Sequence, residues 1–262
     1  MSQEPITLLD IKAPVGSARY FVDPQIPMSA LMTSMLTSVK QGNAIGLFGN
    51  SRDSVLCHRS LAVSDVFSSY LDVGRILLGS YRSISVQLLF LLSEALELPA
   101  MLEVLSPNEQ ALIISTLCDK PADSLAGLVE AMNSWKTNGV TPEILSKVAY
   151  DNANLIKLAN LVAEYEREIK EADLLDYPGA SIMLVDTLTK RKDLARDISK
   201  RYPTIFVDMN GITDGNGALL LKLLVQAGIN MILFCPAGDN VRLEIALDVL
   251  PVAKEFEVRT AA

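Results

Sequence analysis

Residues that commonly carry chemistry are scarce in this chain of 262 residues. It has one histidine, His58, and three cysteines, Cys57, Cys118 and Cys235. Because the cysteines are odd in number, far apart and without a CxxC spacing, neither a disulfide framework nor a zinc site is expected. A single histidine leaves no basis for a histidine metal site or a Ser-His catalytic pair. The cysteines are interpreted as buried structural thiols in a reducing cytosol, so a cytoplasmic location is expected.

Long apolar runs and an excess of basic residues are also missing. No stretch of about 20 positions is free of charges and turn residues, so no membrane span is expected. The first ten residues, MSQEPITLLD, have no basic region ahead of an apolar run, which argues against a secretory signal. Acidic residues number 31 and basic residues 23, a net charge of -8. Strong binding to a phosphate backbone needs a basic face, so any nucleic-acid contact is expected to be local or shared with a partner.

What the sequence has in quantity is apolar residues, which make up 50% of it. Five near-continuous apolar runs are bounded by Gly, Pro or Asn, as is typical of strands buried on both faces. They are Ile6–Ile11, Ala44–Phe48, Arg75–Leu78, Thr204–Asp208 and Asn230–Cys235. Such strands predict an α/β fold with a parallel sheet that is covered by helices.

The segment between Ser83 and Lys200 shows helix signals only. They include a capping box, formed by Ser106 and by Glu109 three residues later, and several further helix-forming stretches. The sequence therefore predicts an α/β domain made of residues 1–95 and 200–262. An all-helical insertion without any strand is predicted at residues 96–199.

Five short motifs follow one another along the chain. The first predicted strand runs into APVGSARY, Ala13–Tyr20, a small-residue loop that ends in a base, as a nucleotide-binding loop would. The other four are Leu47–Arg59 after the second strand, Gly79–Ser83 after the third, LLDY at Leu174–Tyr177, and Tyr202–Leu224, which contains Val207-Asp208 and a leucine-rich helix.

This order of motifs resembles the first motor domain of UvrD-like superfamily 1 helicases, over nearly the whole chain from Ile6 to about Arg259. The corresponding family motifs read AxxGSGKT, TFTNKAAxxMxxR, GTFHS, LDFDDLL and YxxILVDEFQDTNPxQLxLLxLL. Asn50 and Arg59 are in register with the second motif, and the last motif aligns without a gap. The resemblance implies a RecA-like parallel sheet of the P-loop NTPase type with an all-helical inserted subdomain.

Four residues match the nucleotide site that the resemblance implies: Gly16, Ser17, Arg19 and Asp208. ATP hydrolysis in such motors needs a Lys on the terminal phosphates, a hydroxyl on magnesium and a carboxylate that positions water. In this chain Arg19 replaces the Lys, Tyr20 the Ser or Thr, and Met209 the Glu. Pro24 and Pro27 also remove N–H donors near the expected start of the following helix. We therefore expect no ATP or magnesium cofactor, no catalytic residue and no ATPase activity.

Six residues lie where the family touches single-stranded DNA: Asn50, Arg52, Arg59, Ser80, Tyr81 and Arg82. The arginines are suited to phosphates, and Tyr81 is suited to stacking on a base. The alternative, that each is an ordinary loop or helix-face residue, stays open. Trp135 and Tyr165 are interpreted as packing residues of the insertion.

Three functions remain open from the sequence. The favoured one is a catalytically inactive helicase-like domain, a DNA-guiding or scaffolding module of a DNA repair or recombination assembly that binds single-stranded DNA weakly. A divergent ATP-dependent DNA helicase motor half would need a substitute for Glu at Met209. A protein-interaction module without a nucleic-acid role would suit the acidity. No counterpart of the family's second motor domain follows Glu255, so a protein partner such as a nuclease or second helicase subunit is expected, and no membrane.

Overall fold

The computed structural model describes residues 18–22, 45–48, 76–99, 102–208, 215–235 and 256–260. The chain divides into two compact units. The first, called the α/β unit, comprises Met1–Ile84, Thr187–Thr213 and Gly217–Ala262, and the second, called the helical unit, comprises Ser85–Asp186 and Asp214–Asn216. Helices α4 (Tyr81–Leu91) and α9 (Tyr177–Lys190) each run through a division between units. The two main divisions fall after Ile84 and after Asp186.

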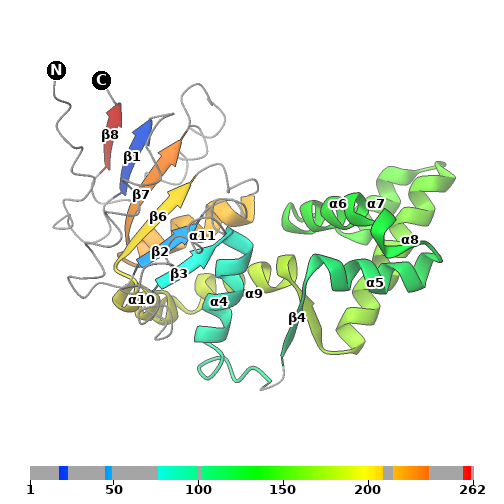
Figure 1. Ribbon diagram of the computed structural model, residues 1–262, viewed down its shortest axis with the longest axis horizontal. Helices are drawn as coiled ribbons and strands as arrows, with labels where there is room; N and C mark the ends of the chain where they lie inside the picture. Colours follow the sequence, from blue (N-terminus) through cyan, green and yellow to red (C-terminus); the bar gives the residue numbers. More distant parts are fainter. Residues whose placement is uncertain are drawn as a thin grey trace. The chain divides into compact units, whose positions relative to one another are not determined.

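A six-stranded sheet forms the centre of the α/β unit, in the order β3-β2-β6-β7-β1-β8 (Figure 1). Each pair of neighbouring strands in it is parallel. The strands are β1 (Ala18–Val22), β2 (Ile45–Phe48), β3 (Ile76–Gly79), β6 (Thr204–Asp208), β7 (Asn230–Cys235) and β8 (Phe256–Thr260). The prediction of an α/β fold with parallel strands is thereby confirmed for the described residues.

Four of the five predicted strands are confirmed. β6 and β7 have the predicted bounds, β2 begins one residue later than predicted, and β3 is shifted by one residue at each end. The fifth predicted strand, Ile6–Ile11, lies outside the described residues. The sequence analysis missed β1 and β8, because ARYFV and FEVRT contain charged residues and are not continuous apolar runs.

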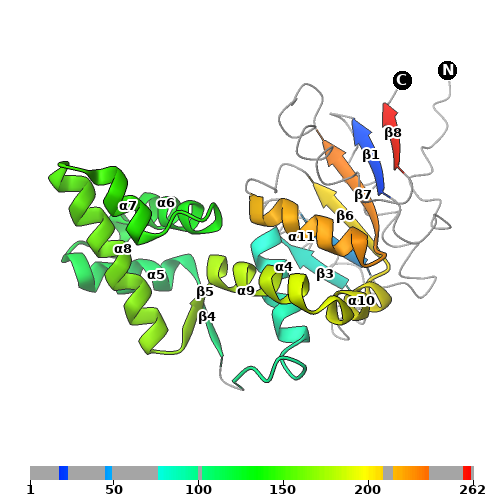
Figure 2. The same cartoon turned by 180° about the vertical axis from the view of Figure 1, so that it is seen from behind.

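Two helices of the α/β unit show how it buries apolar side chains. α10 (Lys192–Arg201) buries one stripe, made of Leu194, Ala195 and Ile198, while its charged residues stay exposed. α11 (Gly215–Gln226) is leucine-rich and buries most of its second half. Figure 2 shows α11 in front of β6 and β7, so this helix covers one face of the sheet there.

After Ser106 the helical unit continues with four α-helices, three of which have a side-chain N-cap. The predicted capping box is confirmed, because Ser106 Oγ accepts from Glu109 N at 3.4 Å and Glu109 Oε2 accepts from Ser106 N at 2.6 Å. The side-chain oxygen of Thr141 caps α7 (Pro142–Ala149), and that of Asn152 caps α8 (Ala153–Glu171). The helices are α5 (Pro107–Cys118), α6 (Ala126–Thr137), α7 (Pro142–Ala149) and α8 (Ala153–Glu171), with a 3-10 turn, η1 (Ala122–Ser124), between the first two.

An apolar core holds α5, α6 and α8 together. Its buried members are Leu105, Ala111, Ile114, Leu125, Val129, Met132, Val162, Tyr165 and Ile169. Trp135 packs against this core while remaining partly exposed. The interpretation of Tyr165 and Trp135 as packing residues of the helical insertion is therefore confirmed.

The expectation that the insertion contains no strand is wrong. β4 (Glu103–Leu105) and β5 (Leu174–Asp176) pair in parallel as a separate two-stranded sheet, with Val104 opposite Leu175. Each strand has three residues and leads directly into a helix, so its sequence is too short to show the period of a strand. The pairing depends on two segments about 70 positions apart, which only the folded chain brings together.

Candidate functional site

The carboxyl ends of the parallel strands form the edge of the sheet where ligands of open α/β sheets bind. The strands end level with one another, because Phe48 pairs with both Gly79 and Val207, and Asp208 pairs with Phe234. Asp208, the last residue of β6, lies at this edge, and Ser80 follows β3 there. The structure therefore brings one predicted nucleotide-site residue and one predicted DNA-contact residue to the same edge of the sheet.

The last three residues of the predicted nucleotide-binding loop, Ala18–Tyr20, lie in β1 and not in a loop. Gly16 and Ser17 lie outside the described residues, whereas Arg19 lies inside β1, where its backbone pairs with Ile232 and Glu257. Because β1 pairs with β7 on one side and with β8 on the other, Arg19 belongs to a strand inside the sheet and not to the loop that follows a strand. The small-residue pattern GSAR resembles a loop in the sequence, and only the pairing with β7 and β8 shows that its last two residues belong to a strand.

The chain segment after β1 has a different composition from the predicted loop. Val22 ends β1 opposite Cys235, and the sequence continues as DPQIPMSA, residues 23–30. This sequence contains two prolines and neither glycine nor lysine. A phosphate-binding loop uses glycines for close backbone approach and a lysine for the terminal phosphates, so none of these parts follows β1 in the sequence.

The predicted DNA-contact residues after β3 occupy the start of α4. Ser80 is its N-terminal cap, because Ser80 Oγ accepts from Ser83 N at 3.3 Å and Ser80 O accepts from Ile84 N at 2.9 Å. Arg82 is partly buried and its Nε donates to the hydroxyl of Tyr81 at 3.2 Å. Tyr81 is 3% exposed.

A base needs an open ring face for stacking, and the buried Tyr81 offers none. The stacking role predicted for Tyr81 is therefore corrected to a packing role. Asn50, Arg52 and Arg59 lie outside the described residues, so their grouping with Ser80 and Arg82 stays a prediction.

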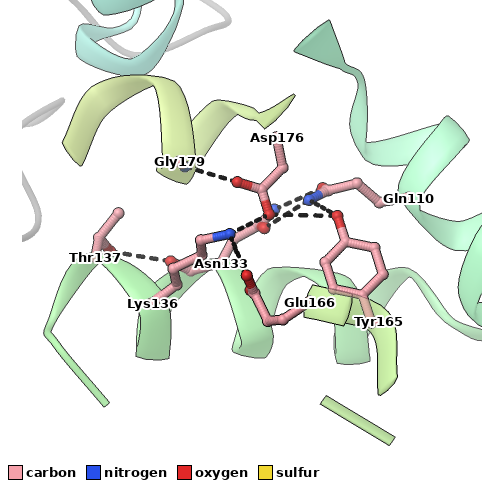
Figure 3. A network of polar contacts seen from close by, with 8 residues as sticks. All are labelled: Gln110, Asn133, Lys136, Thr137, Tyr165, Glu166, Asp176 and Gly179. Atoms are coloured by element: carbon pink, nitrogen blue, oxygen red, sulfur yellow. Dashed lines mark hydrogen bonds and ion pairs between the residues drawn. The ribbon is translucent and has the colours of Figure 1, made fainter. Parts of the chain in front are cut away.

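A second polar site, buried in the helical unit, centres on Asp176 at the junction of β5 and α9 (Figure 3). Its side chain is 1% exposed. Asp176 Oδ1 accepts from Gly179 N at 2.6 Å, so the carboxylate caps α9 and lies at the favourable end of the helix dipole. Asp176 Oδ2 accepts from Lys136 Nζ at 2.9 Å and from the Tyr165 hydroxyl at 3.3 Å. One carboxylate thus connects β5 and α9 with residues of α6 and α8.

Further hydrogen bonds extend this network toward α5. Gln110 Nε2 donates to the Tyr165 hydroxyl at 3.0 Å and to Asn133 Oδ1 at 3.1 Å. Asn133 Nδ2 donates in return to Gln110 Oε1 at 3.0 Å, so the two buried amides form a reciprocal pair. Lys136 also binds Glu166 at 2.9 Å, at the exposed side of the network. The network connects four helices and a strand. Its polar groups are hydrogen-bonded to one another, so none of them is an activated nucleophile.

The Tyr165 hydroxyl is held in its neutral form. Burial raises the pKa of Tyr165 well above its ordinary value, and the neighbouring Asp176 carboxylate adds to the increase. A neutral hydroxyl is a donor as well as an acceptor, so Tyr165 donates to Asp176 while accepting from Gln110. The tyrosine therefore acts as a fixed link in the network and not as an acid or base near neutral pH.

A cavity of about 460 Å³ adjoins this network. Its walls come from α6, the connection to α7, the start of α7, α8 and β5. Trp135 and Val140 contribute apolar surface, whereas Lys136, Glu143 and Glu166 contribute charge. The helical unit therefore contains a concave site that the sequence analysis did not predict.

The LLDY segment is one of the five sequence motifs, but no role for its aspartate, Asp176, was predicted from it. A usable signal was present, since Asp176 follows two leucines and precedes Gly179 by three positions, the spacing of a helix N-cap. Its partner Lys136 is 40 positions away, and Gln110, which is connected to Asp176 through Tyr165, is 66 positions away. No local pattern relates either residue to Asp176.

Charge is divided unevenly between the two units. Ser85–Asp186, the main segment of the helical unit, has 16 acidic and 6 basic residues, a net charge of -10. Since the whole chain has a net charge of -8, the remainder of the chain has a net charge of +2. The acidity that argued against nucleic-acid binding therefore belongs to the helical unit.

Two negative findings apply to the described residues only. None of their helices is long and apolar enough to cross a membrane. Among the described residues, no three His, Cys, Asp or Glu side chains lie close enough together to hold a metal ion.

A parallel sheet with a helical unit inserted between β3 and β6 defines an α/β protein with a large helical insertion. Residues 72–240 match the family profile of the UvrD/REP helicase N-terminal domain. That match covers more than half of the sequence, and the chain belongs to this family. The family resemblance predicted from the motifs is confirmed.

A curated relative matches part of the chain. The chain is 22% identical over 176 residues to "ATP-dependent DNA helicase Rep" of Buchnera aphidicola subsp. Acyrthosiphon pisum (strain APS). This alignment covers 64% of the chain and 26% of the relative. The chain thus spans about a quarter of the length of the relative that it matches.

Proposed function

We propose that this chain is a helicase-type domain that has lost its nucleotide chemistry. Its role is that of a DNA-guiding or scaffolding module in a DNA repair or recombination assembly, on a RecA-like sheet of the P-loop NTPase type. The observation that carries the proposal is the composition of the sequence after β1. With β1 at Ala18–Val22, the segment that follows reads DPQIPMSA and has neither the glycines nor the lysine of a phosphate-binding loop.

The strand end at Asp208 supports the same proposal. In a motor of this family a carboxylate follows the aspartate and positions the attacking water, but Met209 occupies that place. Prolines at residues 24 and 27 lack the backbone N–H groups that cradle phosphates. Several independent parts of the catalytic apparatus are absent from the sequence, so ATPase activity and a bound Mg-ATP cofactor are not expected.

The charge distribution supports a local contact with single-stranded DNA. Outside Ser85–Asp186 the chain has a net charge of +2, so repulsion of phosphates is not a property of the α/β unit. Arg82 follows β3 at the carboxyl edge, and the predicted contacts Asn50, Arg52 and Arg59 follow β2 in the sequence. Binding by so few cations is expected to be weak and to decrease as salt concentration rises.

Two measurements on the whole chain test the proposal. Isothermal calorimetry and a phosphate-release assay with Mg-ATP should detect neither tight binding nor turnover, with or without single-stranded DNA. Fluorescence anisotropy with a labelled oligothymidine should show weak binding near 50 mM salt that is lost near 200 mM. Turnover above that of a buffer blank would refute the loss of nucleotide chemistry.

An arginine variant locates the DNA contact. Arg82→Ala should lower the affinity for oligothymidine and decrease the salt dependence by about one phosphate contact. The matched control is Arg201→Ala, because Arg201 lies three positions before the first residue of β6 and therefore belongs to the amino edge of the sheet. Equal affinities of the two variants would place the DNA contact elsewhere.

Two alternative functions have support of their own. The printed name of the relative, an ATP-dependent DNA helicase, favours a divergent motor half that works only together with further domains. In that case Mg-ATP turnover would be measurable. The charge of the helical unit favours a protein-interaction module, and the absence of any DNA binding at low salt would favour that function instead.

A further inference from the structure

We propose that the cavity of the helical unit is a docking pocket for an arginine side chain of a basic partner protein. This inference goes beyond the proposed loss of nucleotide chemistry and does not depend on it. It rests on the composition of the cavity walls, on the charge inside the cavity and on the charge of the whole unit.

The walls of the cavity suit a long aliphatic side chain. Val140, Pro142 and Val162 line it together with Trp135, and its volume is about 460 Å³. Arginine and lysine bury their methylene stems against apolar surface of this kind while their charged ends reach polar groups. Such a pocket therefore suits the stem of a basic side chain.

The charged groups of the cavity favour a cation. Three carboxylates line it, those of Glu143, Glu166 and Asp176, against the single cation Lys136. Lys136 is already engaged by Asp176 and Glu166, both at 2.9 Å. A hydrogen bond from Thr141 lowers the pKa of Glu143, so this carboxylate is ionised near neutral pH. The cavity thus has a net negative charge, and the exposed Glu143 adds a carboxylate outside the two Lys136 ion pairs.

Arginine fits these groups better than lysine does. Its planar guanidinium binds a carboxylate through two parallel hydrogen bonds and also stacks on an aromatic ring. Glu143 and Trp135 line the same cavity and offer these two partners. A cation over an indole ring contributes about 0.5–1 kcal/mol at an exposed site, in addition to the ion pair.

The charge of the unit selects a basic protein as the occupant over a nucleic acid. With 16 acidic and 6 basic residues in Ser85–Asp186, the unit repels phosphates and attracts basic segments. The α/β unit does not share this acidity.

Trp135 allows a direct test, because it is the only tryptophan of the chain and it lines the cavity. Titration of the whole chain with an acetylated and amidated tetra-arginine peptide should change the Trp135 emission with saturation. The tetra-lysine peptide should bind several-fold more weakly, and a tetra-glutamate peptide should produce no change. The arginine titration should weaken as salt rises.

Two variants separate binding in the cavity from general charge attraction. Ala163→Phe adds a ring at an exposed position of α8 that lines the cavity, so it should abolish the saturable change while α8 remains folded. Glu143→Gln should weaken binding several-fold. The matched control is Asp151→Asn, which removes the same charge from an exposed residue that does not line the cavity, and which should bind like the parent chain.

Three outcomes would overturn the proposal. The first is an emission that does not saturate with tetra-arginine. The second is equal binding by the Ala163→Phe, Glu143→Gln and Asp151→Asn variants, since the attraction would then come from net charge alone. The third is displacement of tetra-arginine by oligothymidine from the same cavity, which would identify a nucleic acid as its ligand.

Discussion

Replacing Lys136 by Met should destabilise the helical unit, because Lys136 is the cation that compensates the buried Asp176. Removal of one partner from a buried ion pair costs about 3–5 kcal/mol. Two features reduce this cost: the side chain of Lys136 is 21% exposed, and Asp176 keeps its hydrogen bonds from Gly179 N and Tyr165. We therefore expect Lys136→Met to lower the free energy of unfolding by about 2–3 kcal/mol.

The measurement is urea unfolding followed by far-ultraviolet circular dichroism and by Trp135 fluorescence. Lys157→Met is the matched control, since Lys157 is an exposed residue of α8 and does not belong to the Asp176 network. It should change the free energy of unfolding by less than about 0.5 kcal/mol.

A double-mutant cycle identifies the interaction itself. Asp176→Asn keeps an acceptor for Gly179 N but removes the charge that Lys136 compensates. The double variant Lys136→Met with Asp176→Asn should be more stable than the sum of the two single effects predicts, by about 1–2 kcal/mol. Additive effects, or a Lys136→Met variant as stable as Lys157→Met, would show that the ion pair does not stabilise the unit.

Three further predictions concern single positions. Gly179→Ala should destabilise the chain in thermal unfolding, because the new Cβ would lie 2.8 Å from Oδ1 of the fixed Asp176. The control Gly127→Ala places its Cβ where no atom lies within 4 Å, so it should be neutral or stabilise the chain by up to about 1 kcal/mol. The raised pKa of Tyr165 gives the fold stability that is fully present below pH about 10 and decreases as the pH rises further. When the free energy of unfolding, measured with urea, is plotted against pH above 10, its decrease should therefore be shallower in Tyr165→Phe, by up to about 1.4 kcal/mol per pH unit. Tyr81→Leu should leave oligothymidine affinity unchanged in anisotropy measurements because the ring is buried, and a loss equal to that of Arg82→Ala would show instead that the ring stacks on a base.

Local sequence patterns determined a substantial part of this protein. β2, β3, β6 and β7 are short apolar runs bounded by turn residues, a pattern typical of strands in a parallel sheet. The capping box at Ser106 depends on two residues three positions apart, so it too is readable. The order of the motifs was sufficient to predict the family.

Tertiary structure alone decided the features that depend on distant residues. β1 became a strand because β7 and β8 lie on both sides of it, although Arg19 interrupts its apolar residues. Tyr81 looked like an exposed aromatic after a strand, but packing buries it. Asp176 meets Lys136 and Tyr165 only when α6, α8 and β5 come together. The propensities of the residues in a segment and the spacing of its apolar residues indicate its local structure. Strand pairing and burial depend on residues that are distant along the chain.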